Sequence, residues 1–412
     1  MLSMALLVAG TSIGAGTLGV PVTLGLAGAG PALSAMLLAW VVMMGTGWIL
    51  SLAIIKSGQP GLEITSLYRL ELGTWAARLA SLVYLVLFHS LLVAYLTGTA
   101  SVLASLLGRP QGQKWFMLVF FLAAGGLTVF GLELVRRCNL VFMLLLAAAF
   151  ALLVGLCLKN YQITRLSYQN WAFLPGAFPI ILCAFGFHNI MPLTCQALDL
   201  NRRRIALALA VGTGLALAVG TGLAFLCNAL WVLAVAGSLP MEEPGQANLL
   251  AAYKLNQPAT VPLAAALHSH LVTWAGLVFS LMAIITSYVG VGVALISFMR
   301  DLLSSWGRVA GRPLLSGLAL LPSLVISLLY PGLFLQALNL VGGGCLILLF
   351  GILPSLMLLK RSADAGKARR VLGWLLLAGF GAFLCLELLQ EMGWLLIRPE
   401  MDHWVINIPG LD

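Results

Sequence analysis

The stretch LLVAGTSIGAGTLGVPVTLGLAGAG, residues 6–30, decides the fold. It is apolar and long enough to cross a membrane, yet it holds glycines at 10, 14, 16 and 19 and a proline at 21. Each glycine weakens a helix interior by about 1 kcal/mol and proline by about 3 kcal/mol. Backbone that leaves helical geometry at membrane depth is tolerated only where it lines a cavity or is buried in protein. The stretch therefore predicts a broken membrane helix beside an interior site.

A second apolar stretch, FPIILCAFGFHNIMPLTCQAL at 178–198, is interrupted in the same way by Gly186, His188, Asn189 and Pro192. Glycines for close helix packing are the alternative for each stretch, but two interruptions at matching positions favour two breaks at one shared site. Neither break contains Asp, Glu, Lys or Arg. Free N–H groups at the start of one half-helix attract a carboxylate, and free carbonyl groups at the end of another half-helix attract an ammonium. Such a pair suits a zwitterionic substrate.

The composition excludes a soluble protein. The 412 residues are 61% hydrophobic and 8% charged, whereas soluble domains carry about 25% charged residues. The net charge of +9 comes from short basic clusters between apolar runs, so we expect no nucleic-acid partner. The seven cysteines form no metal-ligand spacing, so we expect no metal site. The lipid bilayer is the expected surrounding.

A membrane core of ~30 Å needs about 20 apolar residues per helix, and the chain divides into eleven such spans. With an odd number of spans per block, spans 1–5 and 6–10 have opposite orientations, as in inverted repeats. The expected organisation is a first repeat at 1–158, a second at 175–358, an eleventh helix at 371–394 and a short extracytoplasmic tail at 395–412. The span limits are 3–28, 31–55, 77–107, 115–133, 139–158, 175–198, 205–236, 272–299, 314–330, 332–358 and 371–394.

The basic residues set the orientation, because Lys and Arg favour the cytoplasmic side. With the N-terminus inside, 16 of the 22 basic residues fall in cytoplasmic connections. The longest connection outside, 237–271, ends in a short amphipathic piece with His268 and His270. It is interpreted as a lid over a pocket, and a disordered loop is the alternative.

The strings GTSIGAGTLGVP at 10–21 and AFGFHNIMP at 184–192 resemble the aromatic amino acid permeases, the tyrosine- and tryptophan-specific family of the amino-acid permease superfamily. The likeness extends over nearly the whole chain. It implies the leucine-transporter fold, a 5+5 inverted repeat plus one extra helix, and import of tyrosine or tryptophan across the bacterial inner membrane by alternating access. It also implies a proton as the coupling ion and no cofactor.

The resemblance also implies which residues contact the substrate. Backbone around Gly14 would meet the carboxylate, and Phe185, Phe187 and His188 would shape the side-chain pocket, although ordinary packing is the alternative for the phenylalanines. The full expected substrate set is Thr11, Gly14, Ala15, Gly16, Tyr95, Phe185, Gly186, Phe187 and His188.

The ionisable residues inside the spans are His89, His188, Glu387 in the eleventh span and Glu133 at the cytoplasmic end of the fourth. The coupling group is left open between these and other candidates. His188 titrates in the range of a proton carrier, with a neutral histidine that hydrogen-bonds to the substrate or to a helix as the alternative, while His89 is interpreted as a structural histidine. Proton-coupled relatives of the fold often carry a lysine in the fifth span, and residues 139–155 contain none. Sodium coupling is therefore an alternative, with oxygen ligands from Gly10, Ile13, Thr286 and Ser287, although Thr286 and Ser287 can instead bond to the preceding helical turn.

Other functions are less consistent with these residues. All five aspartates lie at span ends or in loops, so no intramembrane aspartyl dyad is available and we expect no enzyme. A channel would not require matched helix breaks. Within transporters, a permease for serine, threonine or a branched aliphatic amino acid is the alternative.

Overall fold

Helices form nearly all of the chain, as expected where no water is present to pair with backbone polar groups. The computed structural model describes residues 12–59, 62–130, 132–192, 195, 206–305, 311–361, 367–397 and 405–406. Nine helices within these ranges are long and apolar enough to cross a membrane, and Pro313–Leu329 is a shorter apolar helix. The predicted all-α polytopic fold is confirmed.

The helices lie close to the predicted spans, and α2 is the described part of the first one. Two limits were misplaced: α7 begins at Leu132 rather than at 139, and α13 continues to Ser305 rather than ending at 299, because a helix can extend beyond the apolar core. The membrane helices are α2 (Ala15–Gly25), α3 (Ala29–Ser57), α5 (Thr74–Leu106), α6 (Gln113–Phe130), α7 (Leu132–Cys157), α8 (Leu174–Ala184), α10 (Ala206–Ser238), α13 (His270–Ser305), α14 (Arg312–Leu329), α15 (Phe334–Asn339) continuing into η6 (Leu340–Ile352) and α16 (Leu353–Arg361), and α17 (Lys367–Glu391).

Shorter elements connect these helices. The tail after α17, predicted as a short extracytoplasmic segment, contains an antiparallel pair in which Leu395 is opposite Ile406. The connecting elements are α4 (Ile64–Leu72), η1 (Pro110–Gly112), η2 (Leu158–Asn160), η3 (Ile163–Ser167), η4 (Trp171–Phe173), η5 (His188–Ile190), α11 (Leu249–Lys254), α12 (Thr260–Leu267), β1 (Leu395–Leu396) and β2 (Val405–Ile406).

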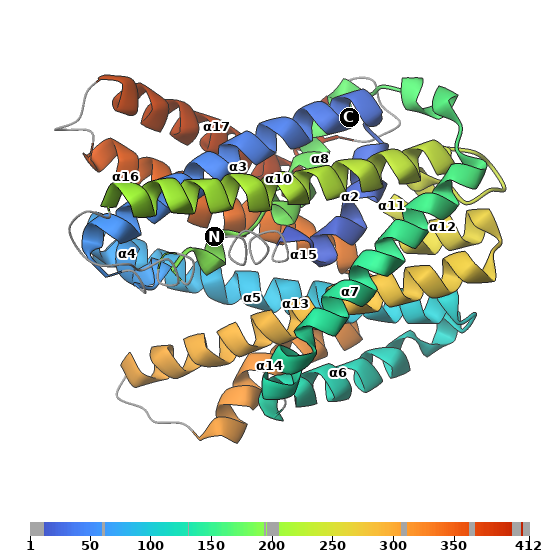
Figure 1. The fold of residues 1–412 in the computed structure, drawn as a ribbon, viewed down its shortest axis with the longest axis horizontal. Coiled ribbons are helices and arrows are strands. Elements are labelled where there is room, and N and C mark those ends of the chain that lie inside the picture. The colour runs from blue at the N-terminus through green and yellow to red at the C-terminus, as the bar shows by residue number, and fades with distance from the viewer. Residues whose placement is uncertain are drawn as a thin grey trace.

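Helices at matching positions of the two predicted repeats pack against each other. In the bundle α2 packs on α8, α3 on α10, α5 on α13 and α6 on α14. Figure 1 shows α3 and α10 running side by side along the long axis of the molecule. These partners are far apart in sequence, so the pairing brings spans 1 and 6, the two with predicted breaks, into contact.

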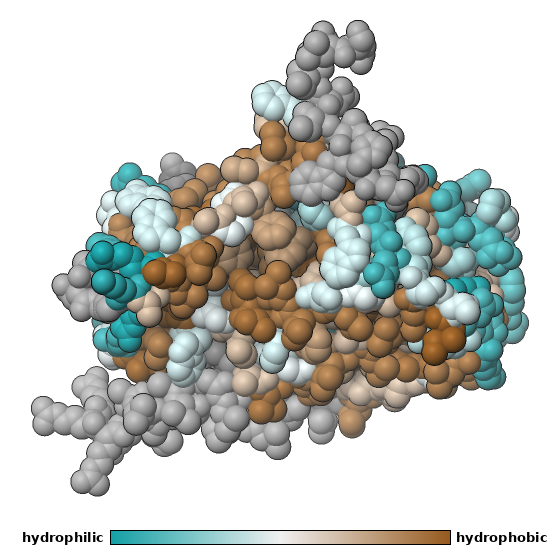
Figure 2. Space-filling model, turned by 90° about the horizontal axis from the view of Figure 1, so that it is seen from above, coloured by the Kyte–Doolittle hydropathy of each residue, from teal (hydrophilic) through white to brown (hydrophobic). Residues whose placement is uncertain are grey.

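The surface agrees with a membrane protein whose helices run along its long axis. Hydrophobic residues cover the middle of the molecule and hydrophilic residues gather at its two ends (Figure 2). Leucines in the apolar zone face outward, and Leu82, Leu122 and Leu226 are each more than half exposed. Lipid is the only surrounding in which such a belt is favourable.

Contacts at the two ends agree with the predicted topology. At one end of the molecule, Arg361, the last residue of α16, forms a bidentate ion pair with Glu71 of α4. Both residues belong to predicted cytoplasmic connections. At the other end, Gln162 N donates to Gly237 O at 2.8 Å, and both belong to predicted outer connections.

The outer connection 237–271 is folded, so the disordered alternative is wrong. It contains α11 and α12. Asn248 caps α11 by accepting from Ala251 N at 2.7 Å, and Ala259 N donates to the carbonyl of Leu18 in α2 at 2.9 Å. The segment therefore covers α2, as a lid would.

Candidate functional site

The first predicted break is present. Ser12 is helical, Ile13 and Gly14 are not, and α2 begins at Ala15. Gly14 has extended backbone, with φ −123° and ψ −155°, and provides no side-chain cap to α2. The first N–H groups of a helix have no partner within it, so the N–H groups of Ala15 and Gly16 need partners outside α2, while Thr17 N donates to Gly14 O at 3.1 Å. Gly10 and Thr11 lie outside the described residues, as does the side chain of Ala15.

The second predicted break is also present. α8 ends at Ala184, Phe185 has φ −108° and ψ 18°, and a short 3-10 turn follows from His188 to Ile190. Pro192 has no N–H to continue an α-helical ladder back to His188, which accounts locally for the interruption. A single apolar stretch is thereby divided at mid-length.

The two breaks are in contact. Gly16, in the first turn of α2, lies so close to the end of α8 that a Cβ atom added there would be 3.2 Å from Ala184 Cα and 3.3 Å from Ala184 N. The start of one half-helix and the end of the other therefore lie side by side. Their opposite partial charges suit the carboxylate and the ammonium of a zwitterion.

Span ten packs beside the place where the two breaks meet. Its segment η6 is a π-helix of 13 residues that contains Gly342, Gly343 and Gly344. A Cβ on Gly342 would overlap the carbonyl oxygen of Pro179 in α8, and one on Gly186 would be 3.3 Å from Leu346 Cδ1 of η6. Glycine at 342 therefore permits backbone contact between α8 and η6.

The aromatic residues of the second break do not form one wall. Phe185 is buried and stacks on Phe225 of α10, with ring centroids 6.4 Å apart. Phe187 is also buried, and its ring would be 2.8 Å from a Cβ on Gly47 of α3. His188 is fully buried between Phe187 and η6. Sequence alone could not assign these directions, because they depend on how α3, α10 and η6 pack.

Tyr95 connects the predicted substrate set to the predicted cation set. It is buried in α5, and its side chain lies near Cys183 of α8 and within hydrogen-bonding reach of Ser287 of α13. The adjacent Thr286 donates to the carbonyl of Met282 at 2.8 Å, which is the back-bonding alternative. Ile13, of the sodium set, is half-buried at the first break.

A role for two hydroxyl groups near the breaks was not predicted from the sequence. Thr17 Oγ1 in the first turn of α2 and Thr99 Oγ1 in α5 are buried and have no hydrogen-bond partner among the described residues. Thr99 is one helical turn after Tyr95, so both are on one face of α5. Threonine is common in membrane helices, where its hydroxyl usually bonds within the helix. Nothing in the sequence therefore distinguishes these two threonines from the others.

Two further ionisable residues of the membrane helices, His89 and Glu387, contact other helices. His89 Nδ1 hydrogen-bonds to Ser323 Oγ of α14 at 2.9 Å, which confirms the structural interpretation. Glu387 of α17 lies on Gly343 of η6, where an added Cβ would be 2.5 Å from the carboxyl carbon. Neither residue belongs to the two breaks.

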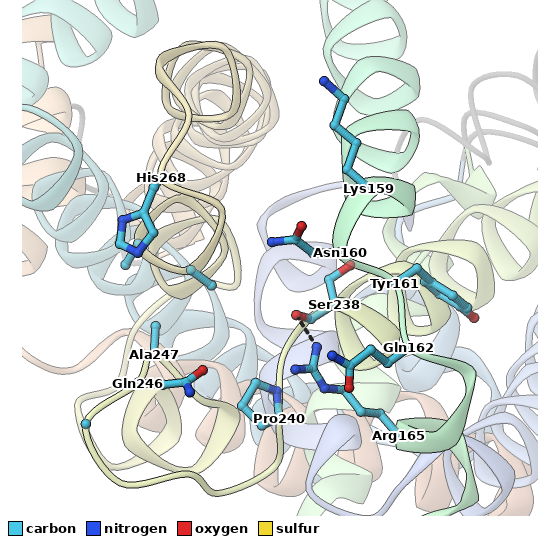
Figure 3. Close-up of a pocket in the computed structure, with 13 residues that line it drawn as sticks. Lys159, Asn160, Tyr161, Gln162, Arg165, Ser238, Pro240, Gln246, Ala247 and His268 are labelled. Carbon is cyan, nitrogen blue, oxygen red and sulfur yellow. Dashed lines mark hydrogen bonds between the residues drawn. The ribbon is translucent and has the colours of Figure 1, made fainter.

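Two pockets open at the predicted outer end. The larger, of 510 Å³, lies between the 159–165 and 238–268 segments, and Arg165 Nη1 donates there to Ser238 O at 2.7 Å. The second, of 370 Å³, shares Arg165 and Pro240 with the first and is bordered by Gly25, the last residue of α2, and by Gly28, which precedes α3. Figure 3 shows the larger pocket between two groups of side chains: Gln246, Ala247 and His268 on one side, and Asn160, Gln162, Arg165 and Ser238 on the other.

Comparison with known proteins agrees with this arrangement. The crystal structure of a manganese transporter mutant from Eremococcus coleocola matches 94% of this chain and 85% of its own, with a TM-score of 0.61 and 15% identity, and shows that the fold is leucine-transporter-like. Tyrosine-specific transport system 1 of Haemophilus influenzae is 31% identical over 346 residues, 82% of either chain. The tryptophan-specific transport protein of the same organism is 27% identical over 368 residues, 83% of either chain.

These findings confirm a multi-pass protein of the bacterial inner membrane, and they point away from an enzyme. The model of the tryptophan/tyrosine permease family matches residues 1–384, nearly the whole chain. The chain is thus a member of the tryptophan/tyrosine permease family.

Proposed function

We propose that this protein imports aromatic amino acids, tyrosine or tryptophan, across the cytoplasmic membrane by alternating access, driven by an inward proton gradient. The observation that carries the proposal is the contact between the two helix breaks at Gly16 and Ala184. Membership of the family and the printed specificities of the relatives support the substrate class.

In this proposal the substrate carboxylate binds the N–H groups at the start of α2, near Gly14, Ala15 and Gly16. A helix N-terminus binds a carboxylate without a cationic side chain, and no residue of the first turn of α2 is acidic. The ammonium binds near the carbonyl end of α8, beside Gly186. The ring lies among buried aromatic and apolar side chains, with Tyr95 on the α5 side.

Alternating access follows from the proposed inverted repeats at 1–158 and 175–358, with α17 as the additional helix. The pairing of α2 with α8, α3 with α10, α5 with α13 and α6 with α14 supports a pseudo-twofold relation between the repeats. The two outer pockets lie on the proposed entry side. Along α2, Leu18, whose carbonyl accepts from Ala259 N, lies between the first break and Gly25 of the second pocket. Import would require this contact to open.

The experiment is uptake of labelled tyrosine and tryptophan into proteoliposomes that contain the purified protein, with every amino acid tested as a competitor. We expect tyrosine and tryptophan to compete most strongly and the non-aromatic amino acids to compete little. Competition by serine or leucine without competition by aromatics would contradict the substrate assignment.

Coupling is tested in the same vesicles. Uptake that alkalinises the medium and does not change when sodium replaces potassium supports the proton. Uptake that depends on sodium at fixed pH would instead favour a cation site formed by Gly10, Ile13, Thr286 and Ser287.

A further inference from the structure

The His188 ring is held rigidly by two other aromatic rings. Phe187 stacks on one face, with centroids 4.5 Å apart and planes at 22°, and Phe350 of η6 stacks on the other, at 4.5 Å and 11°. The side chain has no solvent-exposed surface. With both faces covered, only the ring edge, with its two nitrogen atoms, can form hydrogen bonds.

The neighbours of Nε2 determine where the ring proton lies. Thr46 Oγ1 of α3 is 2.9 Å from His188 Nε2. The single hydroxyl proton of Thr46 is donated to the carbonyl of Met43 at 3.1 Å. The Thr46 oxygen therefore presents a lone pair to Nε2, so Nε2 carries the proton and donates it. In the neutral ring, Nδ1 is then a bare acceptor.

That acceptor is unused. His188 Nδ1 is buried and has no hydrogen-bond partner among the described residues. A buried acceptor without a partner is destabilising, and such a group beside a helix break marks a position that a ligand could complete. A bound water needs two to four polar partners, whereas the groups that flank this nitrogen include the faces of Phe187 and Phe350.

We propose that His188 Nδ1 accepts a hydrogen bond from the ring edge of the substrate, the phenol O–H of tyrosine or the indole N–H of tryptophan. This inference rests on the proposed function and goes beyond it, because it names the residue that excludes phenylalanine. An apolar, aromatic site with one polar atom matches a ring with one polar edge group. Phenylalanine fills the same volume as tyrosine but leaves Nδ1 without a partner.

The expected effect is a preference of about tenfold for tyrosine over phenylalanine, the size of one buried hydrogen bond. Tryptophan should likewise compete about tenfold better than 1-methyltryptophan, in which the indole nitrogen has no proton. These ratios are measured as competition against labelled tyrosine in counterflow, which requires no ion gradient and so is independent of the coupling ion.

Two variants distinguish the ring nitrogens. The amide oxygen of His188→Asn can take the position of Nδ1, whereas His188→Gln places its amide near Nε2 and leaves no acceptor at Nδ1. We expect H188N to keep most of the preference for tyrosine and H188Q to lose it while still exchanging both amino acids. His89→Gln is the matched control, since His89 bonds to Ser323 far from the breaks along the chain, and its ratio should equal that of the wild type.

An unchanged ratio in H188Q would overturn the inference. If the His188 variants do not fold, the wild type alone decides: equal competition by tryptophan and 1-methyltryptophan, or by tyrosine and phenylalanine, would also overturn it. These outcomes differ from failure of the proposed function, in which the wild type would show no counterflow of any aromatic amino acid.

Discussion

Gly16 of α2 packs against the backbone of Ala184 in α8, so that two helix ends from opposite halves of the chain meet in the protein interior. Backbone atoms cannot move aside as a flexible side chain can, and a Cβ atom at position 16 would be only 3.2 Å from Ala184 Cα. The distance between the two breaks therefore depends on the absence of a side chain at one residue.

Replacing Gly16 by valine should abolish transport. The added methyl groups would separate α2 from α8, at a cost of about 1–3 kcal/mol for overpacking, and would displace the free N–H groups. The measurement is tyrosine counterflow, with the amount of folded protein in the membrane determined in parallel. The control is Gly45→Ala in α3, where no atom lies within 4 Å of an added Cβ. Normal counterflow in G16V would show that the close approach is not required.

Replacing Gly342 by alanine should lower stability. The new Cβ would overlap the Pro179 carbonyl oxygen, so η6 and α8 must move apart, and we expect a loss of at least about 3 kcal/mol. Thermal unfolding in detergent measures the change. Gly344→Ala is the matched control in the same helix, since its Cβ would be 3.5 Å from Leu340 Cδ1, an ordinary contact. Equal midpoints for the two variants would be inconsistent with the packing described.

Tyr95→Phe and Ser287→Ala should have non-additive effects on substrate affinity. Each removes one partner of the same hydrogen bond between α5 and α13, so the double variant should be little worse than either single one. The coupling free energy expected for a buried neutral pair is about 1 kcal/mol. Half-saturation constants for tyrosine uptake are measured for the wild type, the two single variants and the double variant, which completes a double-mutant cycle. Strict additivity would mean that the two hydroxyls act separately.

Arg361→Ala should destabilise the protein modestly and in a salt-dependent manner. The side chains of Arg361 and Glu71 are 30% and 18% exposed, and a partly exposed ion pair contributes about 1 kcal/mol or less. High salt should reduce the difference from the wild type, because ions screen the pair. Arg369→Ala, at an exposed position of α17, serves as the control. A loss that persists unchanged in 1 M salt would point to packing rather than charge.

Much of the fold was predictable because membrane helices follow a simple length and polarity rule. Gly14 and Gly186 could be identified as break positions, since glycine in an apolar span needs an explanation other than helix stability. The predicted contact between the breaks followed from their matching places in two blocks of five spans.

The orientation of individual side chains was not predictable. Nothing in the local sequence indicates that Phe187 and His188 face Gly47 and Thr46 of α3 rather than Tyr95, because that depends on packing between elements about 140 residues apart. The π-helical η6 also has no established sequence pattern beyond its glycines, three of them consecutive. Thr46 was overlooked because a threonine in a membrane helix normally bonds to its own helix.

The central claim is that the two breaks together hold the substrate, and a structure of the protein with bound L-tyrosine, determined by cryo-electron microscopy, tests it most directly. The account predicts the carboxylate within hydrogen-bonding distance of the N–H groups of Ala15 or Gly16 and the ammonium beside the end of α8. Tyrosine bound elsewhere, with the α2 and α8 ends still in contact and unoccupied, would contradict it.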